Sequence, residues 1–309
     1  MRPGLTWVVG RGGMLGQSVS RLPDLTEAFI GDPIDWSSVD AVEAITVEAA
    51  RFLDQAGSRP WRVVWCAGAG IIGTGRAELE HETAILAALL DTLGSRQDGT
   101  VFLTSSAGGV YGGTRDIPIT EDSIPMPLSD YGWNKLTQED LVRLWAAESG
   151  GRAIIGRVAN LYGPGQRLSK PQGLITQICR ATLVRRPVSV YVSLDTLRDY
   201  IYVDDCSRII GACVNDADAL DAGTTTIKIL ASGSSVSIGA LLAQARRVLG
   251  RTPAVIMIPS SRTAQQGSAL AFRSTVWRDA SDVDFTPLPV GIHRTAEYLR
   301  RQLQLGTLL

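Results

Sequence analysis

The sequence predicts an α/β protein with a doubly wound parallel sheet and a smaller C-terminal lobe. Through the first half, short apolar runs alternate with amphipathic helical patterns, the order expected for parallel strands covered on both faces by helices. A glycine-rich turn joins the first run to the first helical pattern. Beyond residue 165 this alternation breaks, and shorter runs with two late amphipathic patterns indicate the second lobe.

The elements of the first half follow from periodicity and turn residues. Apolar, β-branched runs predict strands, and patterns with a 3.6-residue period predict helices. The second helix opens with serines suited to an N-cap and ends at Gly57. In chain order we expect strand 5–10, helix 14–22, strand 27–32, helix 37–57, strand 61–68, helix 77–94 and strand 99–106.

The second half begins with a helix containing Tyr131 and the strand in "RAIIGRVANLYGPGQ". Later we expect strands at 188–193, 198–205 and 227–232, and helices at 205–217, 237–250 and 291–303. The polar stretch Ser260–Asp284 has no clear pattern. We expect a dinucleotide-binding domain of residues 1–165 with a returning segment at about 188–231, and a substrate-binding lobe of residues 166–187 and 232–309.

Composition excludes several classes of protein. The 309 residues carry a net charge of -1, which provides no broad attraction to nucleic acid or to a membrane surface. No apolar run approaches the roughly 20 residues of a membrane span, and no signal peptide is recognisable, so a cytoplasmic protein is expected. Four scattered cysteines and two histidines favour neither a disulfide framework nor a metal site, and leave little room for a Ser-His-Asp hydrolase.

The stretch "VVGRGGMLG" places Gly10, Gly13 and Gly16 at three-residue intervals where the first strand meets the first helix. Glycines at such a turn allow a tight bend, close approach of backbone N–H groups to a pyrophosphate, and close helix–strand packing. The alternative is a purely structural turn. The position at the start of a βαβ pattern favours dinucleotide binding.

In "SDYGWNKLTQED", Tyr131 and Lys135 are four residues apart on a predicted helix. Residues at this spacing share a face, so a phenol and an ammonium can act on one bound molecule. Only three lysines occur in the chain, whereas arginine supplies most of the positive charge. The alternative is a packed tyrosine beside a solvated lysine on an ordinary surface helix.

Five blocks, "GRGGMLG", "SSAGGVYGG", "YGWNK", "RVANLYGPGQ" and "RDYIYVDD", together resemble the extended short-chain dehydrogenases/reductases, the nucleotide-sugar epimerase/dehydratase group. The resemblance covers nearly the whole chain. It implies a Rossmann-type sheet that binds NAD(P), with Tyr131 as catalytic acid/base and Lys135 contacting the nicotinamide ribose. It also implies a cofactor-binding set of Gly10, Arg11, Gly13, Met14, Leu15, Gly16, Asp32, Ala67, Gly68, Lys135 and Tyr162.

The chain departs from the family where a catalytic serine or threonine is usual, because that position is Ala107. We expect Ser106 to take over the role, with Ser105 beside the substrate. The alternatives are that the protein relies more heavily on Tyr131, or that both serines only cap the strand end. Related 4,6-dehydratases carry an Asp-Glu pair where this chain has Gly108 and Gly109. Dehydration is therefore not expected, and hydride transfer with one proton transfer remains.

The resemblance also implies substrate contacts at Asn160, at Arg198 and, more weakly, at Arg273. A guanidinium suits the diphosphate of a nucleotide sugar because its fork pairs with phosphate oxygens. The segments Lys170–Arg186 and Ser260–Asp284 are expected to shape the sugar pocket.

For the cofactor, Asp32 or Asp35 after the second strand would hold the adenosine ribose and favour NAD. Arg11 could instead accept the phosphate of NADP, so NAD is preferred and NADP stays open.

These observations predict a nucleotide-sugar oxidoreductase of carbohydrate biosynthesis, foremost a 4-epimerase that removes and returns a hydride at C4. One alternative is a one-way ketoreductase of a nucleotide-linked 4-keto-6-deoxy sugar. An alternative from another class is a non-catalytic dinucleotide sensor. The expected partner is a nucleotide-diphosphate sugar, without nucleic acid or membrane. The family also implies a homodimer through the Tyr131 helix and the helix before it.

Overall fold

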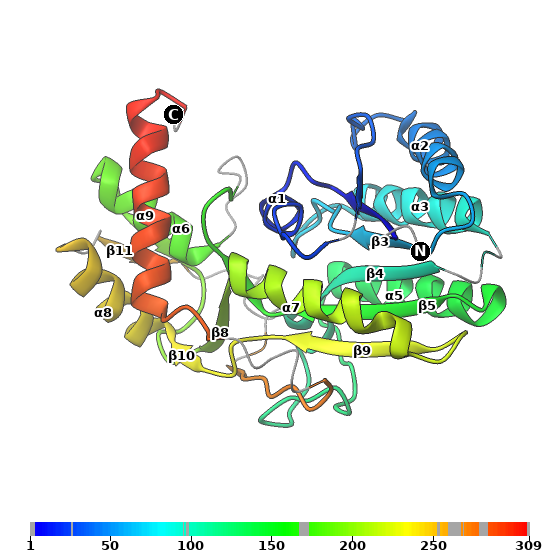
Figure 1. The fold of residues 1–309 in the computed structure, drawn as a ribbon. Coiled ribbons are helices and arrows are strands. Elements are labelled where there is room, and N and C mark those ends of the chain that lie inside the picture. Colours follow the sequence, from blue (N-terminus) through cyan, green and yellow to red (C-terminus); the bar gives the residue numbers. More distant parts are fainter. Residues whose placement is uncertain are drawn as a thin grey trace.

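The computed structural model describes residues 4–25, 27–94, 96, 99–166, 173–251, 254–258, 267, 269–277 and 284–307. Its larger part is a six-stranded sheet in the order β2-β1-β3-β4-β5-β9, with every neighbouring pair parallel (Figure 1). This confirms the predicted doubly wound sheet. The strands are β1 (Leu5–Val9), β2 (Glu27–Phe29), β3 (Trp61–Trp65), β4 (Gly99–Ser106), β5 (Arg152–Val158) and β9 (Thr225–Leu230).

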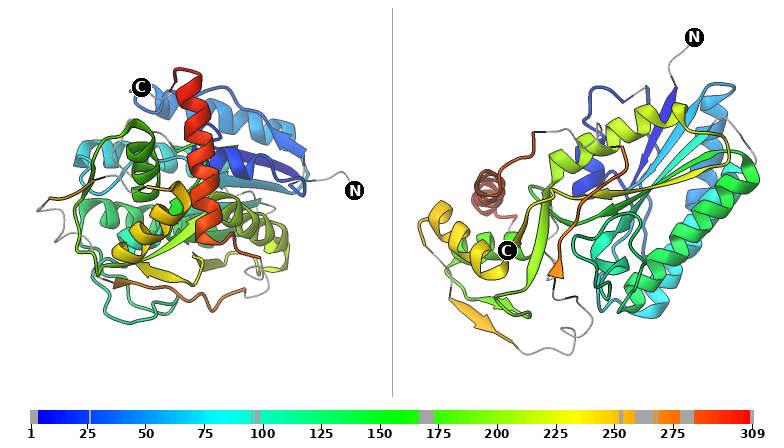
Figure 2. Two further views of the ribbon diagram at one scale, coloured as in Figure 1. Left: turned by 90° about the vertical axis from the view of Figure 1, so that its left-hand side faces the viewer. Right: turned by 90° about the horizontal axis from the view of Figure 1, so that it is seen from below.

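Helices cover both faces of this sheet. Alternate residues of a strand face opposite sides, so adjacent Val63 and Val64 join two different cores although both are fully buried. Figure 2 shows α5 and α7 on opposite sides of the sheet. One face is covered by α2 (Ala41–Ala56), α3 (Arg76–Leu93) and α5 (Asp130–Ser149), and the other by α1 (Met14–Val19) and α7 (Val203–Asn215).

Local capping explains where α5 begins, but it does not explain where α2 begins. Ser129, the N-cap of α5, accepts a hydrogen bond from the Gly132 N–H at 3.3 Å. The serines expected to cap the second helix do not do so, because α2 starts later, after Asp40. Ser37 instead donates its N–H and its hydroxyl to the Asp35 carboxylate, which forms a turn ahead of the helix.

The smaller lobe packs three helices and several short strands (Figures 1 and 2). Its helices are α6 (Leu174–Val184), α8 (Ile238–Leu249) and α9 (Leu288–Gln304). The central strand β8 (Leu197–Tyr202) pairs with β6 (Asn160–Tyr162), β10 (Ser235–Ser237) and β12 (Ala269–Leu270). A second pair joins β7 (Val188–Val190) to β11 (Val255–Met257).

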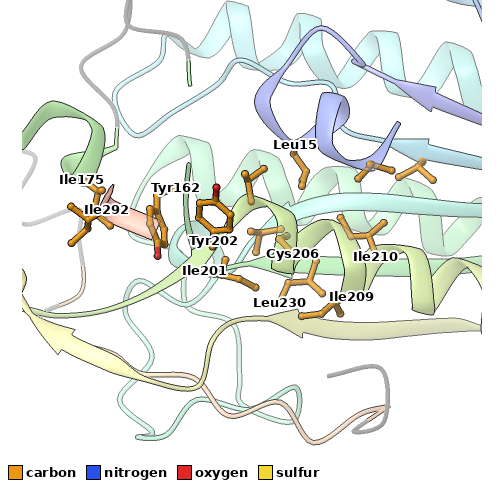
Figure 3. Packing of buried hydrophobic residues seen from close by; sticks show 14 of the residues in the cluster. Leu15, Tyr162, Ile175, Ile201, Tyr202, Cys206, Ile209, Ile210, Leu230 and Ile292 are labelled. Carbon is orange, nitrogen blue, oxygen red and sulfur yellow. The ribbon is translucent and has the colours of Figure 1, made fainter. Parts of the chain in front are cut away.

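One hydrophobic core connects the smaller lobe to the sheet (Figure 3). Tyr162 packs edge-on against Tyr202, with ring centroids 5.6 Å apart. Ile175 of α6 and Ile292 of α9 extend this core on the lobe side, and Ile210 of α7 belongs to it on the sheet side. Because this core contains apolar side chains of both parts, their shared burial holds the lobe against the sheet.

The pairing of strands bears on the division into domains. The short strands β7 and β8 pair only with strands outside the six-stranded sheet in the described part of the chain, whereas α7 and β9 cover and extend that sheet. We therefore propose that the returning segment runs from Val203 to Leu230 rather than from about residue 188. No helix in the described ranges is long and apolar enough to cross a membrane.

Candidate active site

A cleft of about 2140 Å³ opens at the carboxyl ends of β1, β3, β4 and β5, between the sheet and the smaller lobe. The strand order reverses between β1 and β3, because β2 continues on one side and β4 on the other. In open α/β sheets, ligands bind in the crevice at such a point. The topology therefore places a ligand site where the glycine turn lies.

The three glycines of this turn occupy their positions for different structural reasons. Gly10 has φ +82°, and a Cβ there would lie 2.6 Å from the Ala67 nitrogen. A Cβ on Gly16 would lie 2.3 Å from the Gly10 carbonyl oxygen, so both positions require glycine for packing. A Cβ on Gly13 would meet only that oxygen, at 3.4 Å. Gly13 therefore leaves space on the cleft side, which fits the close approach of a dinucleotide pyrophosphate.

Most residues of the predicted cofactor set line the cleft: Gly10, Gly13, Met14, Leu15, Ala67, Gly68, Lys135 and Tyr162. Arg11, Gly16 and Asp32 do not line it. The Asp32 carboxylate is 77% exposed and pairs with Arg51 at 2.8 Å, while its N–H donates to Glu48 on α2. Asp35, the other acid after β2, lies in the cleft wall instead.

Tyr131 lies in the first turn of α5, where its phenol is hydrogen-bonded to the Ser106 hydroxyl. Ser106 ends β4, caps the short helix α4 (Ala107–Val110) and accepts the Gly109 N–H at 3.1 Å. A Cβ on Gly109 would lie 2.9 Å from Cε1 of Tyr131. Glycine at this position therefore lets α4 approach the tyrosine ring, and Ser106 both caps α4 and faces the phenol.

A chain of polar side chains between α3 and α5 holds Lys135, which is 5% exposed. Its ammonium donates to Gln138 Oε1 at 2.9 Å, and Gln138 Nε2 donates to the Thr83 hydroxyl at 3.3 Å. Thr83 in turn donates to Asn134 at 2.8 Å. Lys135 Nζ lies 5.9 Å from the centroid of the Tyr131 ring, so both groups face the same part of the cleft.

Burial raises the pKa of Tyr131; the hydrogen bond to Ser106 lowers that pKa in part, and the Glu82 carboxylate raises it further. Burial lowers the pKa of Lys135, an effect that Glu82 and Glu139 oppose. Desolvation disfavours the charged form of both groups. The raised pKa of Tyr131 favours its neutral phenol, and a positive charge close by would favour the phenolate that an efficient base requires.

Beneath the serines lies a buried ion pair that sequence reasoning missed. Arg157 on β5 and Glu139 on α5 are almost completely inaccessible and meet at 2.6 Å. Glu139 also accepts the hydroxyl of Ser105 at 2.7 Å, and Arg157 donates to the phenol of Tyr111. Ser105 is thereby tied into the protein interior, which leaves Ser106 as the serine that contacts Tyr131.

The predicted substrate contacts lie in two places. Asn160 and Arg198 line the cleft, where Asn160 donates to the Asp199 carbonyl at 2.9 Å and Arg198 is 6% exposed. Ser105 and Ser106 also line it, but Arg273 is exposed and outside it. Residues of α6 line the cleft as expected of the segment Lys170–Arg186. Most of the other expected segment, Ser260–Asp284, lies outside the described residues.

A pair of glycine substitutions tests the packing of the tyrosine. We expect Gly109→Ala to lower turnover about a hundredfold, because displacing a catalytic group by about 1 Å has effects of this order. Gly112→Ala is the matched control, since Gly112 does not line the cleft and a Cβ there would meet its nearest neighbours at an ordinary 3.5 Å or more. The measurement is the steady-state rate of each variant with a sugar nucleotide that the wild type turns over. Equal rates for both variants would contradict the proposed position of Tyr131.

Residues 40–228 match the model of the NAD-dependent epimerase/dehydratase family. The chain belongs to this family. The match covers more than half of the sequence, and it confirms NAD as the predicted cofactor and the resemblance to this family. Four of the five sequence blocks lie within the matched residues, and "GRGGMLG" lies before them. The curated relatives include epimerases, reductases and dehydratases, so membership alone leaves the reaction of this chain open.

Two curated relatives show this range. The chain is 36% identical to a dTDP-4-dehydro-6-deoxyglucose reductase of Escherichia coli over 105 residues, 34% of this chain and 33% of the relative. It is also 36% identical to a UDP-glucose 4-epimerase of Azospirillum brasilense over 121 residues, 35% of this chain and 34% of the relative. The matched segments thus span about a third of each relative.

The fold is shared with a solved structure over nearly the whole chain. The structure of UDP-glucose 4-epimerase from Thermus thermophilus, determined in complex with NAD, superposes with a TM-score of 0.81 at 19% identity. The superposition covers 96% of this chain and 99% of that one. The superposed region thus includes both the large sheet and the smaller lobe of this chain.

Proposed function

We propose that the protein is an NAD-dependent nucleotide-sugar oxidoreductase, foremost a 4-epimerase. The observation that supports this most strongly is the convergence of Ser106, Tyr131 and Lys135 on one cleft beside the glycine turn. A non-catalytic sensor would not need a phenol hydrogen-bonded to a serine and backed by a buried ammonium. The family match adds that NAD is the cofactor, and we propose that the glycine turn binds it.

In this proposal each residue has a definite task. Tyr131 takes the proton of the C4 hydroxyl as C4 is oxidised to a ketone, and it returns a proton to the same oxygen when the ketone is reduced. Ser106 hydrogen-bonds the same oxygen, and Lys135 supplies a fixed positive charge that stabilises the phenolate. NAD held beside Gly13 and Lys135 would supply the hydride chemistry at C4. Rotation of the keto-sugar between the two transfers inverts the centre.

The loop after β4 supports this choice over dehydration. Elimination of water needs an acid and a base in addition to the tyrosine, and the family's dehydratases use an Asp-Glu pair there. This chain has Gly108 and Gly109, and the packing of Tyr131 leaves no room for a side chain at Gly109. A second candidate function is one-way reduction of a nucleotide-linked 4-keto-6-deoxy sugar, which the likeness to the E. coli reductase favours.

We also propose that Arg198 and Asn160 hold the nucleotide diphosphate and the sugar, because both line the cleft on the lobe side. A guanidinium that is 6% exposed is already desolvated, which strengthens its interaction with phosphate oxygens. Asp35 replaces Asp32 as the proposed contact for the adenosine ribose, since only Asp35 lines the cleft. A carboxylate there favours NAD by repelling the additional phosphate of NADP.

The test is the absorbance at about 340 nm, where reduced nicotinamide absorbs, of freshly purified protein mixed with UDP-, GDP- and dTDP-hexoses without added cofactor. A rise with one sugar nucleotide would identify the substrate class and support an epimerase with retained NAD. No change with any sugar, together with turnover of a 4-keto sugar only when NADH is added, would instead establish the ketoreductase.

We propose further that the chain forms a homodimer through α5 and α3. On α5, Trp133 and Leu144 are 60% and 54% exposed, and their spacing of eleven residues places them on one side of the helix. Large exposed apolar side chains on one helix face are typical of an interface. Sedimentation velocity of Trp133→Glu beside wild type tests this: the wild type should be a dimer and the variant a monomer.

A further inference from the structure

Glu82, on α3, has a buried carboxylate oxygen that the reaction described above does not use. Its Oε1 accepts hydrogen bonds from the N–H groups of Ala69 and Gly70, both at 2.6 Å, in the loop that follows β3. Its Oε2 is buried and has no hydrogen-bond partner among the described residues. A buried carboxylate oxygen without a partner carries a high desolvation cost, which indicates that a bound molecule completes its contacts.

This oxygen and the ammonium of Lys135 face the same point of the cleft. A Cβ built on Gly68 would lie 3.5 Å from Lys135 Nζ and 3.6 Å from Glu82 Oε2. The two groups nevertheless form no ion pair within 4.0 Å. A glycine between them, with φ +132°, leaves the space in front of both atoms open. An acceptor and a donor therefore flank one small volume in the cleft wall.

A vicinal diol suits this pair of groups. Each hydroxyl has one proton to donate and lone pairs to accept, whereas an ammonium only donates and a carboxylate only accepts. Lys135 can satisfy hydroxyl lone pairs but cannot receive their protons, and Gln138 Oε1 already accepts from Lys135. The free oxygen of Glu82 is thus the acceptor that a diol held by Lys135 requires.

We propose that Glu82 is a cofactor-binding residue that accepts a hydrogen bond from the nicotinamide ribose while Lys135 donates to it. This inference rests on the proposed NAD site. It adds a contact from α3 that holds the reactive end of the dinucleotide. It also explains why Glu82 binds the loop after β3 with one oxygen only.

Binding by isothermal titration calorimetry tests the proposal with three ligands: NAD, ADP-ribose and ADP. ADP-ribose keeps the second ribose of NAD, and ADP lacks it. We expect Glu82→Gln to raise the Kd for NAD and for ADP-ribose about tenfold or more, the effect of losing a hydrogen bond to a charged group. The Kd for ADP should stay within about twofold, because Gln still accepts from Ala69 and Gly70 through its Oε1.

Two further variants make the result specific. Glu80→Gln removes the same charge from the exposed side of α3, where Glu80 pairs with Arg76, and should leave all three Kd values unchanged. Glu82→Asp keeps the charge but shortens the side chain. It should also raise the Kd for NAD and for ADP-ribose and not for ADP, but by a smaller factor. If Glu82→Gln raises the Kd for ADP as much as the Kd for NAD, Glu82 only positions the loop and the inference is wrong. An unchanged Kd for NAD in this variant would also overturn the inference. A wild type that binds no ligand would refute the NAD site itself.

Discussion

Tyr131→Phe should lower the turnover of the sugar nucleotide by roughly 10²–10⁴-fold, the usual contribution of a positioned acid/base group. Phenylalanine keeps the ring that packs on Gly109 but removes the hydroxyl that is bonded to Ser106. Binding of NAD should therefore change little. The measurements are kcat with the sugar nucleotide that the absorbance screen identifies, and the Kd of NAD.

Tyr298→Phe is the control for this substitution, because Tyr298 lies on α9 and outside the cleft. It should turn over substrate at the rate of wild type. A Tyr131→Phe variant with nearly full turnover would remove the tyrosine from the mechanism. Retained NAD binding without any activity in the wild type would instead favour the dinucleotide sensor.

Arg157→Met should lower the free energy of unfolding by about 3–5 kcal/mol, because it leaves the carboxylate of Glu139 buried without its main counter-charge. Methionine has a similar length and fills much of the same space. The loss of stability therefore results from the missing charge rather than from a cavity. Urea denaturation followed by circular dichroism measures it. Ser105 hydrogen-bonds the same carboxylate, so activity should fall as well.

Arg143→Met is the matched control, since Arg143 contacts the same carboxylate at 3.0 Å but is 34% exposed. Exposed ion pairs contribute little to stability, so Arg143→Met should lower the free energy of unfolding by less than about 1 kcal/mol. Replacing both buried partners, Arg157→Met with Glu139→Leu, should recover part of the loss because no unpaired charge remains. Equal stability of the single and double variants would show that the ion pair is not what stabilises this region.

The sheet and the central residues of the site could be predicted because their signals are local. Strands β1, β3 and β4 are continuous apolar runs, and glycines mark the turn at Gly10. Tyr131 and Lys135 share a helix, so their relation depends only on helical geometry. The position of Ser106, directly before Ala107, favours it over Ser105, and Ser106 lies beside Tyr131 in the structure.

Other features depend on contacts between distant segments, which a single sequence does not reveal. The direction of Asp32 is set by Glu48 and Arg51 on α2, so the acid that lines the cleft is Asp35, three residues later. The Arg157–Glu139 pair joins a strand to a helix, and nothing in the pattern of either element signals it. Glu82 belongs to an ordinary acidic helical stretch, and its buried oxygen becomes evident only against Gly68 and Lys135.

The most direct test of the central claim follows deuterium at C4 of the substrate nucleotide sugar. If the sugar and NAD stay bound in the cleft through both transfers, the hydride removed from C4 should return to the same sugar molecule. Mass spectrometry of the epimer should therefore show the label retained at C4 in unlabelled solvent, without added cofactor. Loss of the label to solvent or to external NAD, with product still formed, would contradict reversible hydride transfer at this site.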